Sequence, residues 1–508
     1  MARIWSKFSK WYLISSSALL VLIWDYLIYW NYFLIGHFGG NYFSEGFASG
    51  SWSKYGFYMI SCLGNLFFPF FGLLTDAWIG RGNAVMIGAM FCLSSWITAA
   101  TGLVIHSYLY QSVHFLWFTL AAGTFLEYIG YTSFRANIIQ YNIDQLVGAS
   151  DIDYNTVIFW HAASVQLTAL IYYPLQCIFL DDSRYFITTI FIVSGISVSL
   201  VLVSHSLFRH KLEENMSLMK NPIKLVVRVL CYARKHKYPE NRSALTYWEE
   251  EAPSRLDLGK EKYGGPFTEE EVEDVRTALR MLPLFIAVFA FALSDDYNWY
   301  ISKDSIKLIS CLIPTDFGHN ACSVILLLAY LYLIRVFFYK YIPNMLSRMS
   351  AGLLFALATS VSKLIIFSFK TLTNLAHNNL ILIVPQILYS VSFILLYPVS
   401  LEFTVAQSPV HMRGVMVGMW YAASVGLGYL LNIVLQFPFN CENEYICTNV
   451  YYYTTKSAIV LLILIVFVIL AKRYKYRVRE NEVNIVQIVD DHYQRYMQQE
   501  EKYHKNLN

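Results

Sequence analysis

Three ionisable side chains lie inside long apolar stretches of this sequence, where they could bind a solute or a proton. Asp25 lies deep in an apolar run at about residues 11–38, and Arg135 has apolar neighbours on both sides. A charge at membrane depth is costly and usually faces a partner or an aqueous pathway, although Arg135 could instead extend to the membrane surface. His161 is either a pH-sensitive group or a hydrogen-bonded packing residue.

These residues must be positioned by helices that cross a membrane. A helix rising 1.5 Å per residue needs about 20 apolar residues to cross about 30 Å of hydrocarbon. Only 14% of the 508 residues are charged, against about 25% in soluble domains. The apolar stretches predict an all-α membrane protein with twelve transmembrane helices, at about residues 11–38, 54–75, 83–105, 113–140, 155–180, 185–208, 276–295, 321–342, 350–369, 379–405, 413–437 and 451–472.

A hydrophilic insert divides the predicted helices into two sets of six. The expected parts are residues 1–208, an insert at 209–275, residues 276–472 and a tail at 473–508. Lys and Arg gather at the N-terminus, in the insert and in the tail, which places all three in the cytoplasm by the positive-inside rule.

The insert itself carries helix signals. Thr268 and Glu271 have the spacing of a capping box and predict a lateral helix that leads into the seventh span. Residues 220–237 mix bases with apolar residues, which suits either a helix on the anionic inner leaflet or a solvated linker.

The ends of two spans carry a candidate gate. Asp76 follows the second apolar stretch, and Arg413 with Gly414 begins the eleventh. An aspartate there can accept hydrogen bonds from a helix N-terminus and pair with a base, which would close the cytoplasmic side. The alternative is a solvated loop carboxylate.

Other function classes are not predicted. The net charge of +3 is small, and nucleic acid is not expected as a partner. The sequence shows no metal-ligand cluster, nucleophile triad or phosphate loop, so neither an enzyme nor a metal or other cofactor is expected. Four cysteines fall in two loops on the oxidising side, and either form two disulfides or stay free: Cys311 with Cys322, and Cys441 with Cys447.

Five stretches carry motifs that can be compared with known families: Gly72 to Arg81, Phe134 to Leu146, Val157 to Leu167, Tyr263 to Val275 and Leu401 to Gly414. In this order they resemble the proton-coupled oligopeptide transporter family, solute carrier 15, and within it the peptide/histidine branch. The chain is similar to a divergent member. The resemblance covers nearly the whole chain and implies the major facilitator superfamily fold, with two six-helix bundles around a site that faces each side alternately.

The resemblance also implies roles for individual residues. The cytoplasmic gate would comprise Asp76, Arg81, Asp144, Glu402 and Arg413. Arg135 matches a lysine that binds the carboxyl end of a peptide, and we expect it in a central cavity. The implied substrate-binding residues are Arg135, Asp25, Tyr29, Tyr32, Tyr58, His161, Gln166 and Phe393.

Several positions depart from the family pattern. Ile28 and Tyr29 replace a glutamate and an arginine tied to proton coupling, and only Asp25 remains of that motif. Without a neighbouring cation, a buried Asp25 would favour its neutral form. Phe393 replaces the glutamate that holds a peptide's amino group, and an ammonium buried there without a partner would be costly.

Two functions follow from these observations. The first is a secondary active or facilitative transporter of small organic solutes, di- or tripeptide-like or amino-acid-derived, with proton coupling weakened or absent. The alternative is a transport-deficient membrane scaffold that binds cytosolic proteins through its insert and tail. The expected location is the plasma membrane or an endolysosomal membrane, with the lipid bilayer and a small solute as partners.

Overall fold

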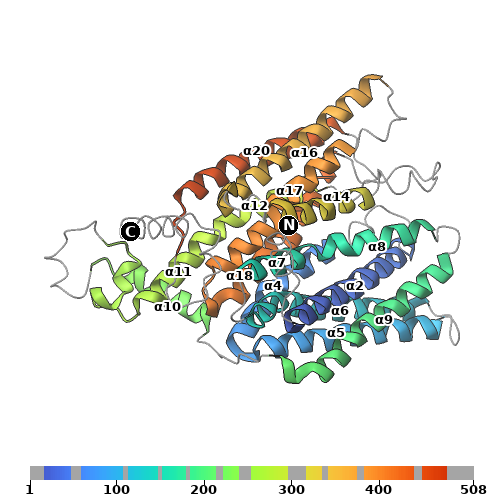
Figure 1. Cartoon of the computed structure of the whole chain (residues 1–508), viewed down its shortest axis with the longest axis horizontal. Coiled ribbons are helices and arrows are strands. Elements are labelled where there is room, and N and C mark those ends of the chain that lie inside the picture. The colour runs from blue at the N-terminus through green and yellow to red at the C-terminus, as the bar shows by residue number, and fades with distance from the viewer. Residues whose placement is uncertain are drawn as a thin grey trace, which may run out of the picture.

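The computed structural model of the chain is helical throughout its regular parts (Figure 1). It describes residues 16–46, 59–106, 113–146, 151–178, 183–212, 221–238, 253–295, 316–334, 341–373, 383–439 and 449–477. Within these ranges, strand-like pairing is limited to one isolated bridge between Lys260 and Phe267. The expectation of an all-α protein is therefore confirmed.

The first half of the chain forms one group of helices. They are α2 (Ser16–Gly46), the short turn η1 (Asn65–Phe67), α4 (Phe68–Leu74), the π-helical turn η2 (Thr75–Ile79), α5 (Arg81–Val104), α6 (Val113–Asp144), α7 (Asp151–Ala162), α8 (Ser164–Ile178) and α9 (Ser183–Phe208). Most bounds lie within a few residues of the predicted spans. The fifth predicted span is the exception, because a break at Ala163 divides it into α7 and α8.

The second half forms another group. Its elements are α12 (Ile286–Ser294), α14 (Asp316–Ala329), the π-helical turn η10 (Tyr330–Ile334), α16 (Met345–Thr373), α17 (Ile383–Gln407), η13 (Val410–Met412), α18 (Arg413–Tyr421), the π-helical turn η14 (Ala422–Gly428), α19 (Tyr429–Val434), η15 (Phe437–Phe439) and α20 (Val450–Arg473). Figure 1 shows this group, yellow to red, on one side of the blue-to-green first half.

Nine helices among the described residues are long and apolar enough to cross a membrane. The other three predicted spans correspond to α6, to α7 and α8, which the break divides, and to α14, which is short. The molecule is a multi-pass membrane protein, and the count of twelve crossings stays a prediction.

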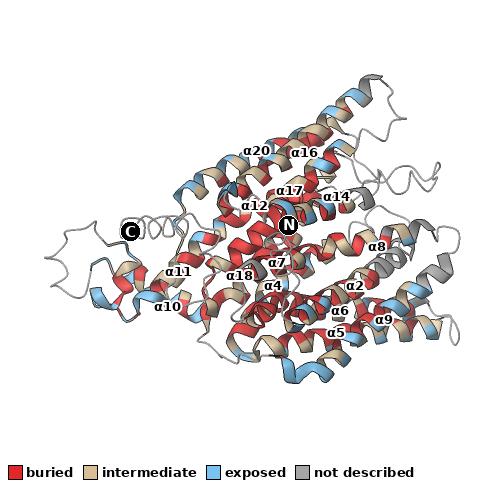
Figure 2. Ribbon diagram, in the orientation of Figure 1, coloured by how far each residue is buried: buried red, intermediate tan, exposed pale blue. Residues whose placement is uncertain are grey.

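The core lies where the two groups of helices face each other. Figure 2 shows buried residues concentrated along α6, α7, α12, α17 and α18. By contrast, α20 and α9 carry many exposed apolar side chains, which is expected of helices with a lipid-facing side. Across the interface, α4 packs on α18, α8 packs on α14 and α7 packs on α17.

The insert contains a folded module. Its elements are η4 (Arg209–Lys211), α10 (Pro222–Lys235), η6 (Asp257–Gly259), η7 (Glu261–Tyr263) and α11 (Glu269–Met281), which leads through η8 (Leu282–Phe285) into α12. Thr268 and Glu271 form the predicted capping box. Because α11 is joined so closely to α12, the predicted boundary at residue 275 falls inside α11. We call the side of the molecule that carries this module the insert end.

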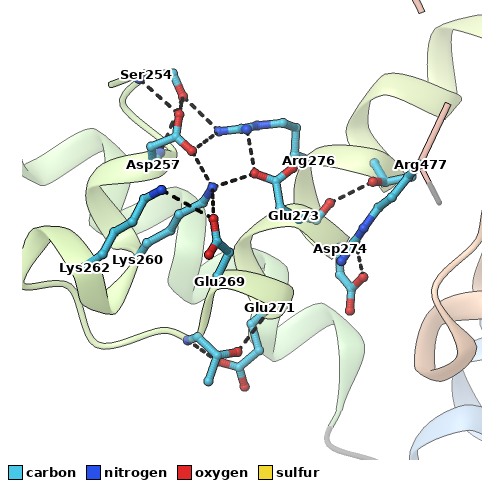
Figure 3. A network of polar contacts seen from close by, with 12 residues as sticks. Ser254, Asp257, Lys260, Lys262, Glu269, Glu271, Glu273, Asp274, Arg276 and Arg477 are labelled. Atoms are coloured by element: carbon cyan, nitrogen blue, oxygen red, sulfur yellow. Dashed lines mark hydrogen bonds and ion pairs between the residues drawn. The ribbon is translucent and has the colours of Figure 1, made fainter. Parts of the chain in front are cut away.

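One lysine holds the insert module together. Lys260 is 5% exposed, and its Nζ lies 2.9 Å from Asp257, 3.2 Å from Glu269 and 2.7 Å from Glu273 (Figure 3). Burial alone would raise the pKa of Asp257, but donors from Lys260, Ser254 and Arg276 outweigh it and hold that pKa well below its usual range. The module is therefore stabilised by charge pairing around a buried ammonium group.

We expect Lys260→Met to loosen this module, because three carboxylates would lose their shared cation. The cost should be about 1–3 kcal/mol, measured as faster cleavage of the insert by chymotrypsin in the purified protein. Lys262→Met is the control, since Lys262 is 54% exposed and 3.5 Å from Glu269. The depressed pKa of Asp257 means that its contribution is present above about pH 4 and is lost in stronger acid. Equal cleavage rates for the two variants would contradict this role.

The residues after α20 form a short segment, 474–477, which we call the strap. Gln407 Oε1 accepts hydrogen bonds from Tyr474 Oη at 3.0 Å and from the Arg477 amide at 3.1 Å. Arg477 also pairs with Asp274 on α11 (Figure 3), and Asp274 lies 3.6 Å from His411. The strap therefore ties α11 and α17 together at the insert end.

Candidate functional site

A break in the fifth predicted helix positions the central polar residues. His161 is in the last turn of α7, Ser164 begins α8, and the Ala163 amide bonds back to Phe159 and Trp160. Carbonyl groups at a helix C-terminus lack intrahelical partners and carry partial negative charge. The His161 carbonyl is therefore available to a cation from another helix.

Arg135 on α6 supplies that cation. Its Nη2 donates to the His161 carbonyl at 2.9 Å and to Ser164 Oγ at 2.8 Å, and its Nη1 forms an ion pair with Asp25 on α2. Arg135 and Asp25 are 2% and 1% exposed. Arg135 therefore lies in the interior, and the alternative that it extends to the membrane surface is wrong.

The expectation that Asp25 has no neighbouring cation is also wrong. It followed from the loss of the arginine at Tyr29, but Arg135 pairs with Asp25 instead, across 110 positions of sequence. The two side chains meet because of the way α2 and α6 are oriented about their axes. A comparison of motifs within α2 alone could not reveal this pairing. Asp25 is thus held in a buried ion pair, where the ionised form is favoured.

His161 completes the cluster. Its Nδ1 lies 2.8 Å from Asp25 Oδ2, and its Nε2 lies 2.8 Å from the side-chain amide of Asn142 on α6. The imidazole has no exposed surface. We refer to Asp25, Arg135, Asn142, His161 and Ser164 as the central polar cluster. The two alternatives for His161 remain, because these hydrogen bonds suit a packing residue and a titrating one alike.

Aromatic rings from both halves enclose the cluster. The Arg135 guanidinium carbon lies 5.9 Å from the ring centroid of Tyr29 and 5.6 Å from that of Tyr421, within the range of cation–π attraction. Tyr421 belongs to α18, so Arg135 contacts the second half of the chain. Tyr32 stacks on Tyr131 with centroids 3.7 Å apart.

The remaining predicted substrate residues are distributed around this centre. Phe393 is buried on α17 and stacks on Tyr397 with centroids 5.6 Å apart. Gln166 is buried on α8, and no described donor reaches its Oε1. Tyr58 lies outside the described residues. In this conformation side chains enclose Arg135, so the predicted central cavity stays a prediction.

The predicted gate residues meet at the insert end. Asp76 Oδ2 accepts a hydrogen bond from the Val415 amide at 3.1 Å, in the first turn of α18 as predicted. Arg81 pairs with Asp144 at 2.9 Å and donates to the Val410 carbonyl at 3.1 Å. Two of these contacts, from the Val415 amide to Asp76 and from Arg81 to the Val410 carbonyl, join the two halves of the chain at the insert end.

Glu402 of α17 pairs with an arginine of α16, and its predicted gate role stays a prediction. Its carboxylate lies 3.5 Å from Arg348 of α16, and both residues belong to the second half. Arg413 begins α18 beside Gly414. A Cβ atom added to Gly414 would lie only 2.6 Å from Asp76 Oδ2. The contact between Glu402 and Arg348 braces α17 against α16.

The disulfide prediction needs a partial correction. Cys322 has a free thiol and lies within α14 instead of in a loop, so the predicted bridge with Cys311 is not formed. Cys311, Cys441 and Cys447 lie outside the described residues.

Sequence reasoning missed three residues of the site, which are Asn142, Ser164 and Tyr421. Asn142 follows Arg135 by seven positions, so the helical period places both on one face of α6, and this signal was available. Tyr421 had no such signal, because its place beside Arg135 depends on how the two halves pack.

Comparison with known proteins gives one family. A family model described as the POT family matches residues 185–440. The fold is similar to that of an auto-inhibited POT family peptide transporter, with a TM-score of 0.62 and 15% identity over 93% of this chain and 99% of that one. It is similar to the transporter PepTSo, with a TM-score of 0.62 and 16% identity over 90% and 98%. A POT family transporter in complex with 5-aminolevulinic acid gives 0.58 and 16% over 90% and 96%.

Proposed function

Because the chain belongs to the POT family, we propose that it carries small carboxylate-bearing solutes, peptide-like or amino-acid-derived, across a membrane by alternating access. The observation that carries this proposal is Arg135, a buried cation at the centre of the molecule that contacts residues of both halves. A guanidinium group binds a carboxylate through paired, charge-assisted hydrogen bonds.

A solute carboxylate would compete with Asp25 for Arg135. The guanidinium group already holds one carboxylate in the closed conformation, so exchange would replace one ion pair at Arg135 by another and leave Asp25 with the imidazole of His161 beside it. The aromatic rings of Tyr29 and Tyr421 would pack against the body of the solute.

Opening would separate the two halves at the insert end. The hydrogen bonds from the Val415 amide to Asp76 and from Arg81 to the Val410 carbonyl would break in this step. We propose that the insert and tail face the cytosol, as the Lys and Arg distribution supports, in the plasma membrane or an endolysosomal membrane. Solute movement would be secondary active or facilitative.

The test is uptake by proteoliposomes that contain the purified protein. The solutes are alanyl-phenylalanine, N-acetyl-alanyl-phenylalanine and 5-aminolevulinic acid, the last because a similarly folded transporter binds it. The variant Asp25→Asn/Arg135→Gln removes both charges together and should lower uptake about 100-fold, the equivalent of about 3 kcal/mol of lost binding. Lys224→Gln, at an exposed position on α10, is the control and should transport like the wild type.

A membrane scaffold is the second candidate, because the insert module exposes an apolar stripe. Ile223, Val227 and Leu230 of α10 are 47%, 51% and 39% exposed, and bases lie beside them. Such a stripe is typical of a docking surface. Absence of uptake of every solute by the wild type would contradict transport of this solute class and favour the scaffold.

A further inference from the structure

We propose that His161 is the proton-binding residue of the central polar cluster, and that the site takes up one proton with each monoanionic carboxylate solute it binds. This inference rests on the proposed transport function and adds to it a coupling residue and a solute class. It is carried by the hydrogen-bond partners of the imidazole, by the charges around it and by the aromatic surroundings of Phe393.

The two ring nitrogens of His161 have different partners. Nδ1 faces Asp25 Oδ2 at 2.8 Å, and an ionised carboxylate can only accept, so Nδ1 carries a hydrogen in every state. Nε2 faces the Asn142 amide at 2.8 Å. Gain or loss of a proton is therefore confined to Nε2.

The Asn142 amide can serve both states of that nitrogen. With Nδ2 toward the ring, it donates to the lone pair of a neutral imidazole, and no described donor reaches Asn142 Oδ1 in this arrangement. Rotating the amide by half a turn places Oδ1 against Nε2, where it accepts a hydrogen bond from the imidazolium. An amide offers both a donor and an acceptor at one position, which a histidine that changes protonation requires.

The charges of the cluster require a proton when an anion binds. Among the described residues, the charged groups that contact His161 are Asp25 from α2 and Arg135 from α6. The nearby Tyr26 donates its hydroxyl hydrogen to the Trp160 carbonyl at 2.7 Å. With neutral His161, the charges of Asp25 and Arg135 cancel.

A solute carboxylate on Arg135 would leave this buried cluster with one excess negative charge, and an uncompensated charge is costly in a low-dielectric interior. One proton on His161 Nε2 restores neutrality, because the imidazolium then pairs with Asp25 while Arg135 pairs with the solute. When the solute leaves, the proton leaves Nε2 and Asp25 pairs with Arg135 again. No other group has to change its charge.

The balance of charges in the site also favours one class of solute. The position aligned with the family's amino-group ligand is Phe393, which packs with Phe291 and Tyr397. A zwitterionic peptide would bring an ammonium group with no carboxylate at that position, whereas an N-acylated peptide would not. We therefore assign monoanionic carboxylates with an apolar or aromatic body as the preferred class.

The test is calorimetric titration of the purified protein with N-acetyl-alanyl-phenylalanine in buffers of different ionisation enthalpy, which gives the number of protons bound. The wild type should take up about one proton per ligand, and its apparent Kd should rise about tenfold per pH unit on the alkaline side of the titration. Alanyl-phenylalanine should bind at least about tenfold more weakly. His161→Gln should bind with no proton uptake and a Kd independent of pH.

The control is His205→Gln, because His205 lies on α9 against Trp24, with ring centroids 5.6 Å apart; it should behave as the wild type. His161→Tyr is the second variant if His161→Gln does not fold. Ligand binding without proton uptake in the wild type, or uptake that persists in both His161 variants, would overturn this inference and leave transport standing. Failure of both peptides to bind would overturn the proposed function and this inference together.

Discussion

Replacing Arg135 by glutamine is expected to destabilise the folded protein by about 3–5 kcal/mol, the cost typical of breaking one side of a buried ion pair. Asp25 would lose its guanidinium partner at 1% exposure, which is costly whether the carboxyl group keeps its charge or takes up a proton. The His161 carbonyl and Ser164 hydroxyl would lose the donor that Arg135 supplies. The measurement is the midpoint of thermal unfolding in detergent.

The paired variant Asp25→Asn/Arg135→Gln should recover most of this loss, because no uncompensated charge remains. Arg81→Gln is a control at a second ion pair. Because Arg81 and Asp144 are 16% and 15% exposed, this substitution should lower the free energy of unfolding by about 1 kcal/mol or less. If the single and paired variants at the centre unfolded at the same temperature, the ion pair would not be the stabilising feature described here.

Replacing Gly72 by valine is expected to prevent closure of the insert end. A Cβ atom at Gly72 would lie 2.2 Å from the backbone oxygen of Gly414. This clash is with the backbone of a helix, which cannot move aside as the end of a flexible side chain can. Overpacking of this kind costs about 1–3 kcal/mol or more, so the closed state should lose up to about 100-fold in population and uptake should fall with it.

This effect can be measured as a distance. Spin labels at Asn83→Cys and Arg280→Cys, in a background without other exposed cysteines, report the separation of α5 and α11 at the insert end. Gly36→Val is the matched control, because a Cβ at Gly36 meets nothing within 4 Å. A Gly72→Val protein with the wild-type distance and wild-type uptake would show that the α4–α18 contact is not part of the gate.

Local signals account for the predictions that hold. The capping box at Thr268 depends on four consecutive residues, Thr268 to Glu271, and the structure reproduces it. Asp76 was expected at the N-terminus of the eleventh span, and it accepts the hydrogen bond there. The apolar stretches placed most helix bounds within a few residues, because helices are the stable choice for a chain surrounded by lipid.

Partner choice between distant helices explains the prediction that fails. Asp25 was expected to lack a cation, yet it pairs with Arg135 on another helix. Which face of a helix meets which neighbour depends on rotations that one sequence does not specify. The break at Ala163 is also hidden, because the chain there contains neither proline nor glycine.

The strap has a consequence for the synthesis of the chain. Asp274 and its partner Arg477 are 203 positions apart, so at roughly 5–20 residues per second the ribosome supplies Arg477 about 10–40 s after Asp274. Until then α11 lacks this tether to the end of α17. A polypeptide that ends prematurely before residue 474 would lack this tether permanently, and quality-control proteases should remove it sooner than the full chain.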